Sequence, residues 1–277
     1  MKHVRRLLGA TGGLARFLET TTKHHEGQPP RDAWQEFRLT DKGKAYRELV
    51  KELAVRQHGL CIYCERRLTD DTGEFVKRPI NGKTVDVRSV EHVQPKSSSV
   101  QNVLDWRNLA LDCMGNSAGG DDSCEKNPQV TCGQRKRDRE LPRGCDPRDF
   151  PDVASPMTHV GLDGALIANK PSCEAADICG EDLQRTIDNL LNLNNESLKL
   201  ARSYVGNEVR KNIHDLKEWC LTEGASAEDM AEAICRLAGN RLQPDSVGHL
   251  CSFWTAERSA FGEFAEMWIA KNQHLFA

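Results

Sequence analysis

The sequence lacks any long uncharged apolar run, since none of its 277 residues lies in a stretch near the ~18–20 apolar residues that a membrane span needs. Hydrophobic residues make up 38% of the chain, charged residues 29%, and the mean hydropathy is −0.60. The start, Met1–Leu8, is basic like a signal peptide, but glycines and Arg16 interrupt its apolar run. Because no acidic residue precedes Glu19, a transit peptide is the alternative. We expect a soluble, cytoplasmic protein that does not bind membranes.

The sequence also lacks a large excess of either charge, with 38 Lys and Arg against 41 Asp and Glu, a net charge of −3 and a pI near 6.3. This balance excludes a globally basic protein that coats nucleic acid. The charge is uneven along the chain, at +5 over residues 1–60, zero over 61–150 and −8 over 151–277. A polyanion would therefore bind the first half of the chain, because the acidic C-terminal third would repel it.

Repeats and low-complexity tracts are absent, and 277 residues correspond to about two domains. The spacing of apolar residues predicts three parts: a helical extension over 1–60, a core rich in glycine and polar residues over 61–150, and a helical region over 151–277. The predicted strands are 83–93 and 109–111. The predicted helices are 41–57, capped by Asp41 and ended by Gly59, then 134–140, 181–191, 196–220, 227–237, capped by Ser226 and ended by Gly239, and 260–273.

The chain has 11 cysteines, an odd number that excludes complete pairing in disulfides. Without a secretion signal, clustered cysteines indicate metal binding and scattered ones indicate simple burial. The clustered ones are Cys61, Cys64, Cys113, Cys124, Cys132 and Cys145. The motif Cys61-Ile62-Tyr63-Cys64 predicts a zinc knuckle, and a closed site of four sulfurs would make the zinc structural. A redox Cys-x-x-Cys is the alternative, but no βαβ pattern surrounds it.

A second group of polar residues follows the knuckle. Glu91 and His92 end the first predicted strand, Asn108 begins the next, and Lys136 lies in the helix after it. This order over Cys61–Asp138 resembles the HNH endonucleases and, more narrowly, the PtuB-type HNH proteins of Septu and retron antiphage systems. The motifs that carry the resemblance are Trp34–Phe37, Gly59–Glu65, Val90–Ser97, Trp106–Leu109, Cys132–Asp138 and Leu190–Asn194.

The resemblance implies a mainly helical α+β fold, in which a zinc-stabilised ββα-metal core lies between an N-terminal helical extension and a C-terminal helical region. It favours Cys113 and Cys132 as the remaining zinc ligands over Cys124 and Cys145, because the Lys136 helix follows Cys132 in the expected order. Eighteen residues separate Cys113 from Cys132, so Cys124 stays an alternative fourth ligand.

Phosphodiester hydrolysis needs an activated water and neutralisation of the phosphate charge. Glu91 offers a hard oxygen ligand to a catalytic Mg²⁺ or Mn²⁺ ion. His92, neutral near pH 7, can accept the proton of the water. We expect Asn108 to hydrogen-bond His92 and fix its ring. Basic side chains of Lys96, Arg135 and Lys136 are the expected phosphate contacts.

One position departs from the HNH pattern, in which a further metal ligand directly follows the last knuckle cysteine. Here that residue is Gly133. Gln134, Asn116 or Asp138 could take over this role, or water could fill the coordination shell. Alternatively, the missing ligand makes this protein a poor nuclease.

The sequence thus predicts a metal-dependent HNH endonuclease that cuts DNA as the effector of an antiphage complex. By resemblance, its partners would be a PtuA-like ABC-type ATPase and, in some systems, a retron reverse transcriptase with its DNA. The acidic C-terminal third is the candidate docking surface for a basic partner. An RNase that cuts RNA such as tRNA with the same site, and a zinc-stabilised scaffold without catalysis, are the alternatives. Gly133 favours the scaffold, whereas Glu91 and His92 argue against it.

Overall fold

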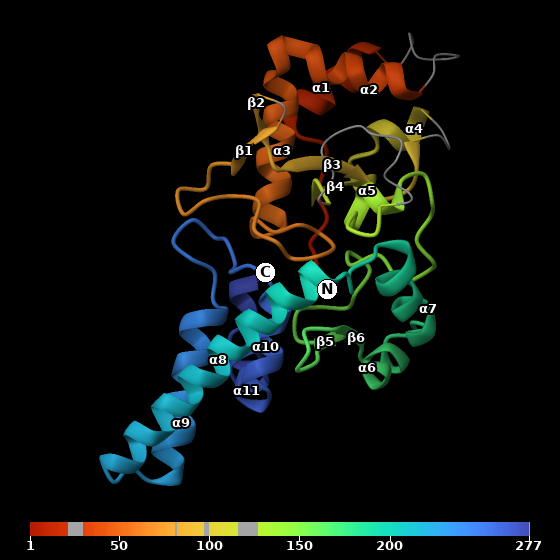
Figure 1. The fold of residues 1–277 in the computed structure, drawn as a ribbon. Coiled ribbons are helices and arrows are strands. Elements are labelled where there is room, and N and C mark those ends of the chain that lie inside the picture. The colour runs from red at the N-terminus through yellow and green to blue at the C-terminus, as the bar shows by residue number, and fades with distance from the viewer. Residues whose placement is uncertain (22–29, 81, 97–99, 116–126, 277) are drawn as a thin grey trace.

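The computed structural model describes residues 1–21, 30–80, 82–96, 100–115 and 127–276, which form a mainly helical α+β fold (Figure 1). The α-helices are α1 Gly12–Thr21, α2 Pro30–Leu39, α3 Lys44–Arg56, α4 Val100–Leu104, α5 Cys132–Lys136, α6 Lys170–Ala175, α7 Gly180–Arg185, α8 Glu196–Thr222, α9 Ala227–Leu242, α10 Trp254–Phe261 and α11 Glu263–Lys271. Shorter helical turns are η1 Thr40–Gly43, η3 Trp106–Asn108, η5 Thr186–Leu190 and η6 Gln273–Phe276. The strands are β1 Lys77–Ile80, β2 Lys83–Asp86, β3 Arg88–His92, β4 Leu109–Cys113, β5 Thr158–Val160 and β6 Leu166–Ala168.

Helix α3 leads the chain into the first cysteine pair, as the sequence predicts, but it begins later than expected. Asp41 and Lys42 have left-handed backbones, with φ of 50° and 55°, and belong to η1. The helix starts only at Lys44, after Gly43, and no side chain caps it. The prediction that Asp41 caps this helix is therefore wrong, because the left-handed backbone of Asp41 and Lys42 places Asp41 in η1, and Gly43 precedes the first helical residue instead.

The predicted strand 83–93 is two strands with different partners. β2 pairs with β1 in an antiparallel hairpin, and β3 pairs antiparallel with β4. The change occurs at Val87, whose N–H donates to Val76 O over 2.9 Å while its own carbonyl accepts from Met114 N. The third pair, β5 and β6, lies beside α6 and α7 (Figure 1).

The C-terminal helices also differ in their ends from the predicted ones. The capping box of Ser226 and Asp229 is present, but α9 continues through Gly239 to Leu242. The predicted helix 260–273 is α10 and α11, separated at Gly262, whose φ is 58°. Helix α7 ends at Arg185 and continues as the π-helical turn η5. Among the helices of the described ranges, none combines the length and the apolar character needed to cross a membrane.

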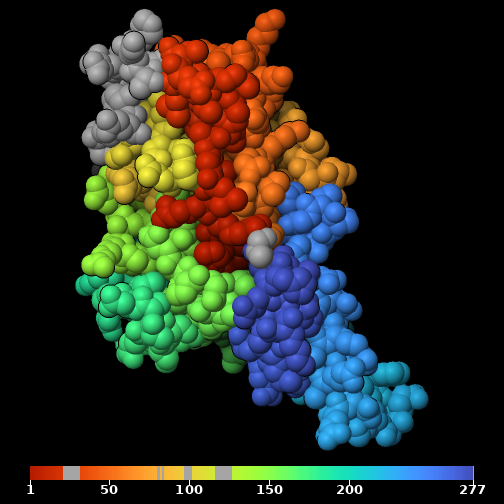
Figure 2. Space-filling view, turned by 180° about the vertical axis from the view of Figure 1, so that it is seen from behind, coloured from red at the N-terminus to blue at the C-terminus, as the bar shows by residue number. Residues whose placement is uncertain are grey.

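Helices α8 and α9 form a hairpin that projects away from the rest of the protein (Figures 1 and 2). Its base packs on α10 and α11 through a hydrophobic cluster around Val209, Ile234 and Trp254. The larger hydrophobic cluster joins most of the other elements and extends in sequence from Met1 to Ala256 on α10. It draws on all three predicted parts of the chain, and the division at residues 60 and 150 stays a prediction.

Two glycines inside these helices allow a matched test of the packing. A Cβ on Gly239 would lie 3.0 Å from Cδ1 and Cε2 of Trp268 on α11, and closer still to Nε1. A Cβ on Gly206 of α8 would meet only the mobile end of the Arg210 side chain, at 3.1 Å. The close approach of α9 to α11 therefore depends on glycine at residue 239.

We predict that Gly239→Ala lowers the free energy of unfolding by about 1–3 kcal/mol, because the methyl group forces the indole aside. Gly206→Ala should raise it by about 0.5–1 kcal/mol through helix propensity. Denaturant unfolding of both variants measures the effect, and an unchanged midpoint for Gly239→Ala would contradict the packing described for α9 and α11.

Candidate functional site

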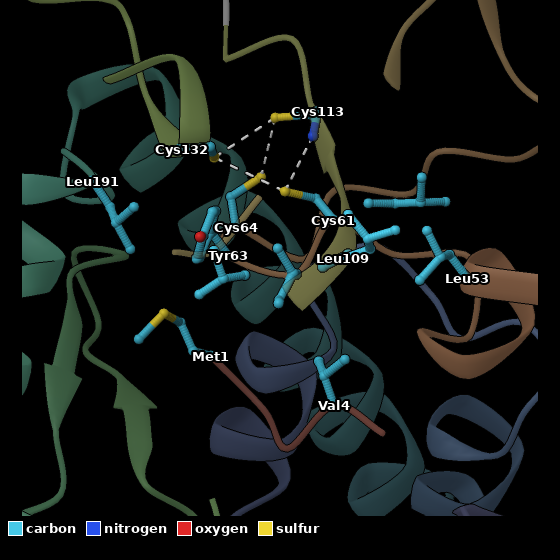
Figure 3. Close-up of a cluster of buried hydrophobic side chains, with 14 of the residues drawn as sticks. Met1, Val4, Leu53, Cys61, Tyr63, Cys64, Leu109, Cys113, Cys132 and Leu191 are labelled. Atoms are coloured by element: carbon cyan, nitrogen blue, oxygen red, sulfur yellow. Dashed lines mark hydrogen bonds between the residues drawn. The ribbon is translucent and has the colours of Figure 1, made fainter. Parts of the chain in front are cut away.

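Four buried cysteines form a cluster at the centre of the protein (Figure 3). The sulfurs of Cys61, Cys64, Cys113 and Cys132 all lie within 4.8 Å of one another. Three of the separations are 3.9, 3.7 and 3.6 Å. Zinc bound to four sulfurs at about 2.3 Å in a tetrahedron requires separations of about 3.8 Å. The donor set and the spacing therefore fit a structural zinc ion.

Three separate segments bring these cysteines together. Cys61 and Cys64 lie on a tight turn in which Cys61 N donates to Arg66 O over 2.9 Å. Cys113 ends β4, and Cys132 begins α5. The side chain of Gln57, just after α3, accepts from Leu111 N over 2.6 Å and donates to Leu111 O over 2.8 Å, which fixes β4 beside the turn.

The fourth ligand depends on a segment that is distant in sequence, residues 190–195. Leu191 O accepts from Cys132 N over 2.9 Å. Asn192 Nδ2 donates to Val130 O over 3.0 Å, and Asn195 Nδ2 donates to Pro128 O over 2.8 Å. The motif around Leu190–Asn194 thus holds the backbone that leads into the zinc ligand.

The electrostatic surroundings of the cluster suit thiolate ligands. Burial lowers the pKa of the Arg66 guanidinium, but the charges of the four cysteines outweigh this effect and raise it above the ordinary value. Four thiolates around a divalent ion leave two negative charges, which a nearby arginine stabilises. Arg66 supplies such a charge from the turn that carries Cys61 and Cys64.

The side chain of Glu91 lies on the face of strand β3 that is turned towards the Cys61–Cys64 knuckle. Glu91 Oε1 accepts a hydrogen bond from the Tyr63 hydroxyl over 3.0 Å and forms an ion pair with Lys136 Nζ, also at 3.0 Å. Burial and the charge of Glu91 raise the pKa of Tyr63, so its phenol stays a donor. One carboxylate oxygen is therefore held in place by two fixed partners.

A second carboxylate, Asp112, lies beside Glu91 and was missed by the sequence analysis. Asp112 faces Ser89 across the β3–β4 pair, which places it on the same side as Glu91. It accepts hydrogen bonds from the Ser89 hydroxyl and, over 3.0 Å, from Gly133 N. Burial and the charge of Glu91 raise the pKa of Asp112 well above its ordinary value. Only the strand register would have revealed it.

Gly133 lies against both carboxylates. A Cβ at this position would be 2.5 Å from Glu91 Oε2 and closer still to Asp112 Oδ2. Gly133 is not among the residues with positive φ, so space and not backbone conformation requires glycine here. Of the alternative ligands, Asp138 is exposed, and Asn116 lies outside the described residues together with Cys124.

His92 points to the opposite side of β3, since successive side chains alternate along a strand. Its Nε2 lies 3.0 Å from Val103 O, and its ring contacts Trp34 edge-on with centroids 4.6 Å apart. Within the described ranges, the buried Nδ1 has no hydrogen-bond partner. Burial, together with the charge of Lys96, lowers the pKa of His92 to about 3, so the ring is neutral at pH 7.

Asn108 does not contact His92, and the expected hydrogen bond between them is wrong. Its side chain accepts from Gln94 N over 2.7 Å and donates to Gln94 O and Asn102 O over 3.0 and 2.9 Å. Both amide N–H groups and the amide oxygen of Asn108 bond the segment that follows β3. Asn108 therefore fixes the chain that carries Val103, and it positions His92 through that carbonyl.

The three residues predicted to contact phosphate differ in their exposure. Lys136 is fully buried, and besides Glu91 its ammonium contacts the carbonyls of His92, Arg137 and Arg139. It cannot reach a phosphate from there, so its predicted role is corrected to holding Glu91. Lys96 and Arg135 are half-buried and stay predicted contacts. Helix α5 is also shorter than the predicted 134–140, because Arg137 has a φ of 52°.

We predict one zinc ion per chain, and Cys132→Ser should remove it because three sulfurs no longer close the tetrahedron. Cys145→Ser should keep the zinc, since Cys145 lies near Thr186 and outside the cluster. Metal analysis of the purified proteins by plasma mass spectrometry measures this. Retained zinc in Cys132→Ser, with loss in Cys124→Ser, would make Cys124 the fourth ligand.

No protein-family profile matches the sequence. The chain is 27% identical, over 197 residues, to an Escherichia coli protein named "Retron Ec83 putative HNH endonuclease". The matched region covers 64% of this chain and 71% of that protein. This similarity, together with the four-cysteine cluster, supports a relationship of the chain to the HNH endonucleases.

Proposed function

We propose that this protein is a metal-dependent HNH endonuclease that hydrolyses phosphodiester bonds of DNA. The observation that carries the proposal is His92, a buried neutral imidazole with one nitrogen held by a backbone carbonyl and the other without a hydrogen-bond partner among the residues that the structure describes. It directly follows Glu91, whose carboxylate is fixed on the zinc knuckle through Tyr63. A purely structural zinc module has no need of this pair, and the similarity to a named HNH endonuclease agrees with it.

His92 is the general base in this proposal. Val103 O fixes the proton on Nε2, which leaves the Nδ1 lone pair as the acceptor for the proton of the attacking water. Nδ1 is buried on the face of β3 opposite Glu91, so this step requires the His92 ring to move towards the bound ion when DNA binds. The low pKa keeps the free enzyme in the basic form, and a bound phosphate raises it by bringing negative charge close to the ring. Asn108 maintains this geometry by fixing the segment before Val103.

Glu91 would hold the catalytic Mg²⁺ or Mn²⁺ ion through the carboxylate oxygen that Lys136 and Tyr63 leave available. Such an ion supplies charge neutralisation at the phosphate and stabilises the departing 3′ oxygen. Lys136 keeps the carboxylate oriented from the α5 side. Lys96 and Arg135 provide positive charge for the DNA backbone at the edge of the site.

We predict that the protein nicks plasmid DNA with Mg²⁺ or Mn²⁺ and that His92→Ala reduces the rate by about 10²-fold or more, as expected for loss of a general base. His214→Ala, an exposed histidine on α8, is the matched control and should cleave like the wild type. Gel analysis of nicked and linear plasmid gives the rate, with the partner ATPase proposed below absent or present. If the protein cleaves RNA but not DNA, RNA is the substrate. If it cleaves neither polymer, the protein is a zinc-stabilised scaffold without catalysis.

We also propose that the tip of the α8–α9 hairpin docks an antiphage ATPase of the PtuA kind, with a retron reverse transcriptase and its DNA as further partners. The tip is acidic, with six Asp and Glu against one Lys between residues 215 and 232. Trp219 and Leu221 are 60% and 64% exposed there, on the part of the hairpin that projects from the body (Figure 2). An exposed aromatic ring within an acidic surface fits a basic partner with an apolar pocket.

We predict that Trp219→Ala weakens co-purification with this ATPase at least tenfold, since buried tryptophans contribute strongly to interfaces. Leu162→Ala, at a position 77% exposed in the β5–β6 turn, is the control and should leave the complex intact. Deletion of the whole C-terminal region is unsuitable, because residues 190–195 hold Cys132. Undiminished binding by Trp219→Ala would remove the hairpin tip from the interface.

A further inference from the structure

Resting on the proposed nuclease function, we propose that Asp112 is the second protein ligand of the catalytic divalent cation, in place of the side chain that Gly133 lacks. The ligand has moved from the start of helix α5 to the neighbouring strand β4. The two carboxylates that bind the ion are then Glu91 Oε2 and Asp112 Oδ2. Neither the knuckle spacing nor the comparison with the retron protein assigns a role to Asp112.

The geometry at Gly133 carries this assignment. Glu91 Oε2 and Asp112 Oδ2 are each within 2.5 Å of the point where a Cβ of residue 133 would lie, so they are at most 5.0 Å apart. A divalent cation bound to two oxygens at about 2.0–2.6 Å spans up to about 5 Å. Both oxygens therefore converge on the space that a side chain at residue 133 would otherwise fill.

Glu91 Oε2 and Asp112 Oδ2 keep lone pairs for a cation, although Asp112 Oδ2 also accepts one hydrogen bond, from Gly133 N over 3.0 Å. Glu91 Oε1 bonds Tyr63 and Lys136, and Asp112 Oδ1 accepts from Ser89. Lys136 compensates one of the two negative charges. Over the described part of the chain, no basic side chain forms an ion pair with Asp112, so the second charge lacks compensation by the protein. A bridging divalent cation supplies it.

Asp112→Asn is the informative variant because it preserves the local bonding. The amide oxygen can accept from Gly133 N, and the amide nitrogen can donate to the Ser89 hydroxyl, so only the charge is lost. Asp71→Asn is the control, since the Asp71 side chain is 98% exposed on the knuckle side of the protein. Zinc content and thermal midpoint, measured alongside, show whether each variant is folded.

Mn²⁺ binding to the zinc-loaded full-length protein, followed by electron paramagnetic resonance, measures the site without DNA. We expect Asp112→Asn to weaken Mn²⁺ binding at least tenfold and Asp71→Asn to bind like the wild type.

Unchanged Mn²⁺ affinity in a folded Asp112→Asn would overturn the assignment, and plasmid cleavage by the wild type would then leave the proposed nuclease standing. Absence of Mn²⁺ binding by the wild type would also overturn it. Mn²⁺ binding that depends on Asp112, in a protein that cuts neither DNA nor RNA, would support the cation site and overturn the nuclease.

Discussion

The four-sulfur cluster is the contact on which the rest of the structure depends. It joins the turn after α3, the end of β4 and the start of α5, which are also held together by hydrogen bonds of Gln57 to Leu111 and of Gly133 to Asp112. The region between residues 61 and 150 contributes apolar side chains such as Ile62, Leu109 and Leu111 to the larger core, and zinc bound at the cluster would add the free energy of metal binding to its folding. The positions of Glu91 and Asp112 follow from the cluster, because β3 and α5 both attach to the strand that carries Cys113.

The protein interior between β3 and the cysteine cluster is unusually polar, since a lysine, two carboxylates and a phenol lie together there. Each group has a defined partner: Tyr63 and Lys136 bond Glu91, and Gly133 N bonds Asp112. Such a network is stable only when all of its members are satisfied. In the nuclease that we propose, fixed polar groups of this kind would cost little reorganisation on binding a phosphate, as in other preorganised sites.

The four cysteines that the sequence predicts to share a zinc site do lie together, because the Cys-x-x-Cys spacing and the order of the later cysteines do not depend on fine geometry. It failed where tertiary contacts decide. Asp112 became visible only through the register of β3 against β4, which a single sequence does not encode clearly. Lys136 looked like a solvated charge, and only the packing of α5 on β3 shows it as the buried partner of Glu91. Asp41 failed for a local reason, its left-handed backbone.

The contact between Cys132 and Leu191 has a consequence for the order of synthesis. A ribosome delivers the chain from its N-terminus, so all four cysteines emerge well before the segment that holds the last of them. Until residues 190–195 are available, the backbone of residues 128–132 lacks the carbonyl and amide partners that fix it. The four-cysteine cluster would therefore reach its final geometry late, and the hydrolytic activity that we propose would be withheld from the nascent chain until residues 190–195 have been made.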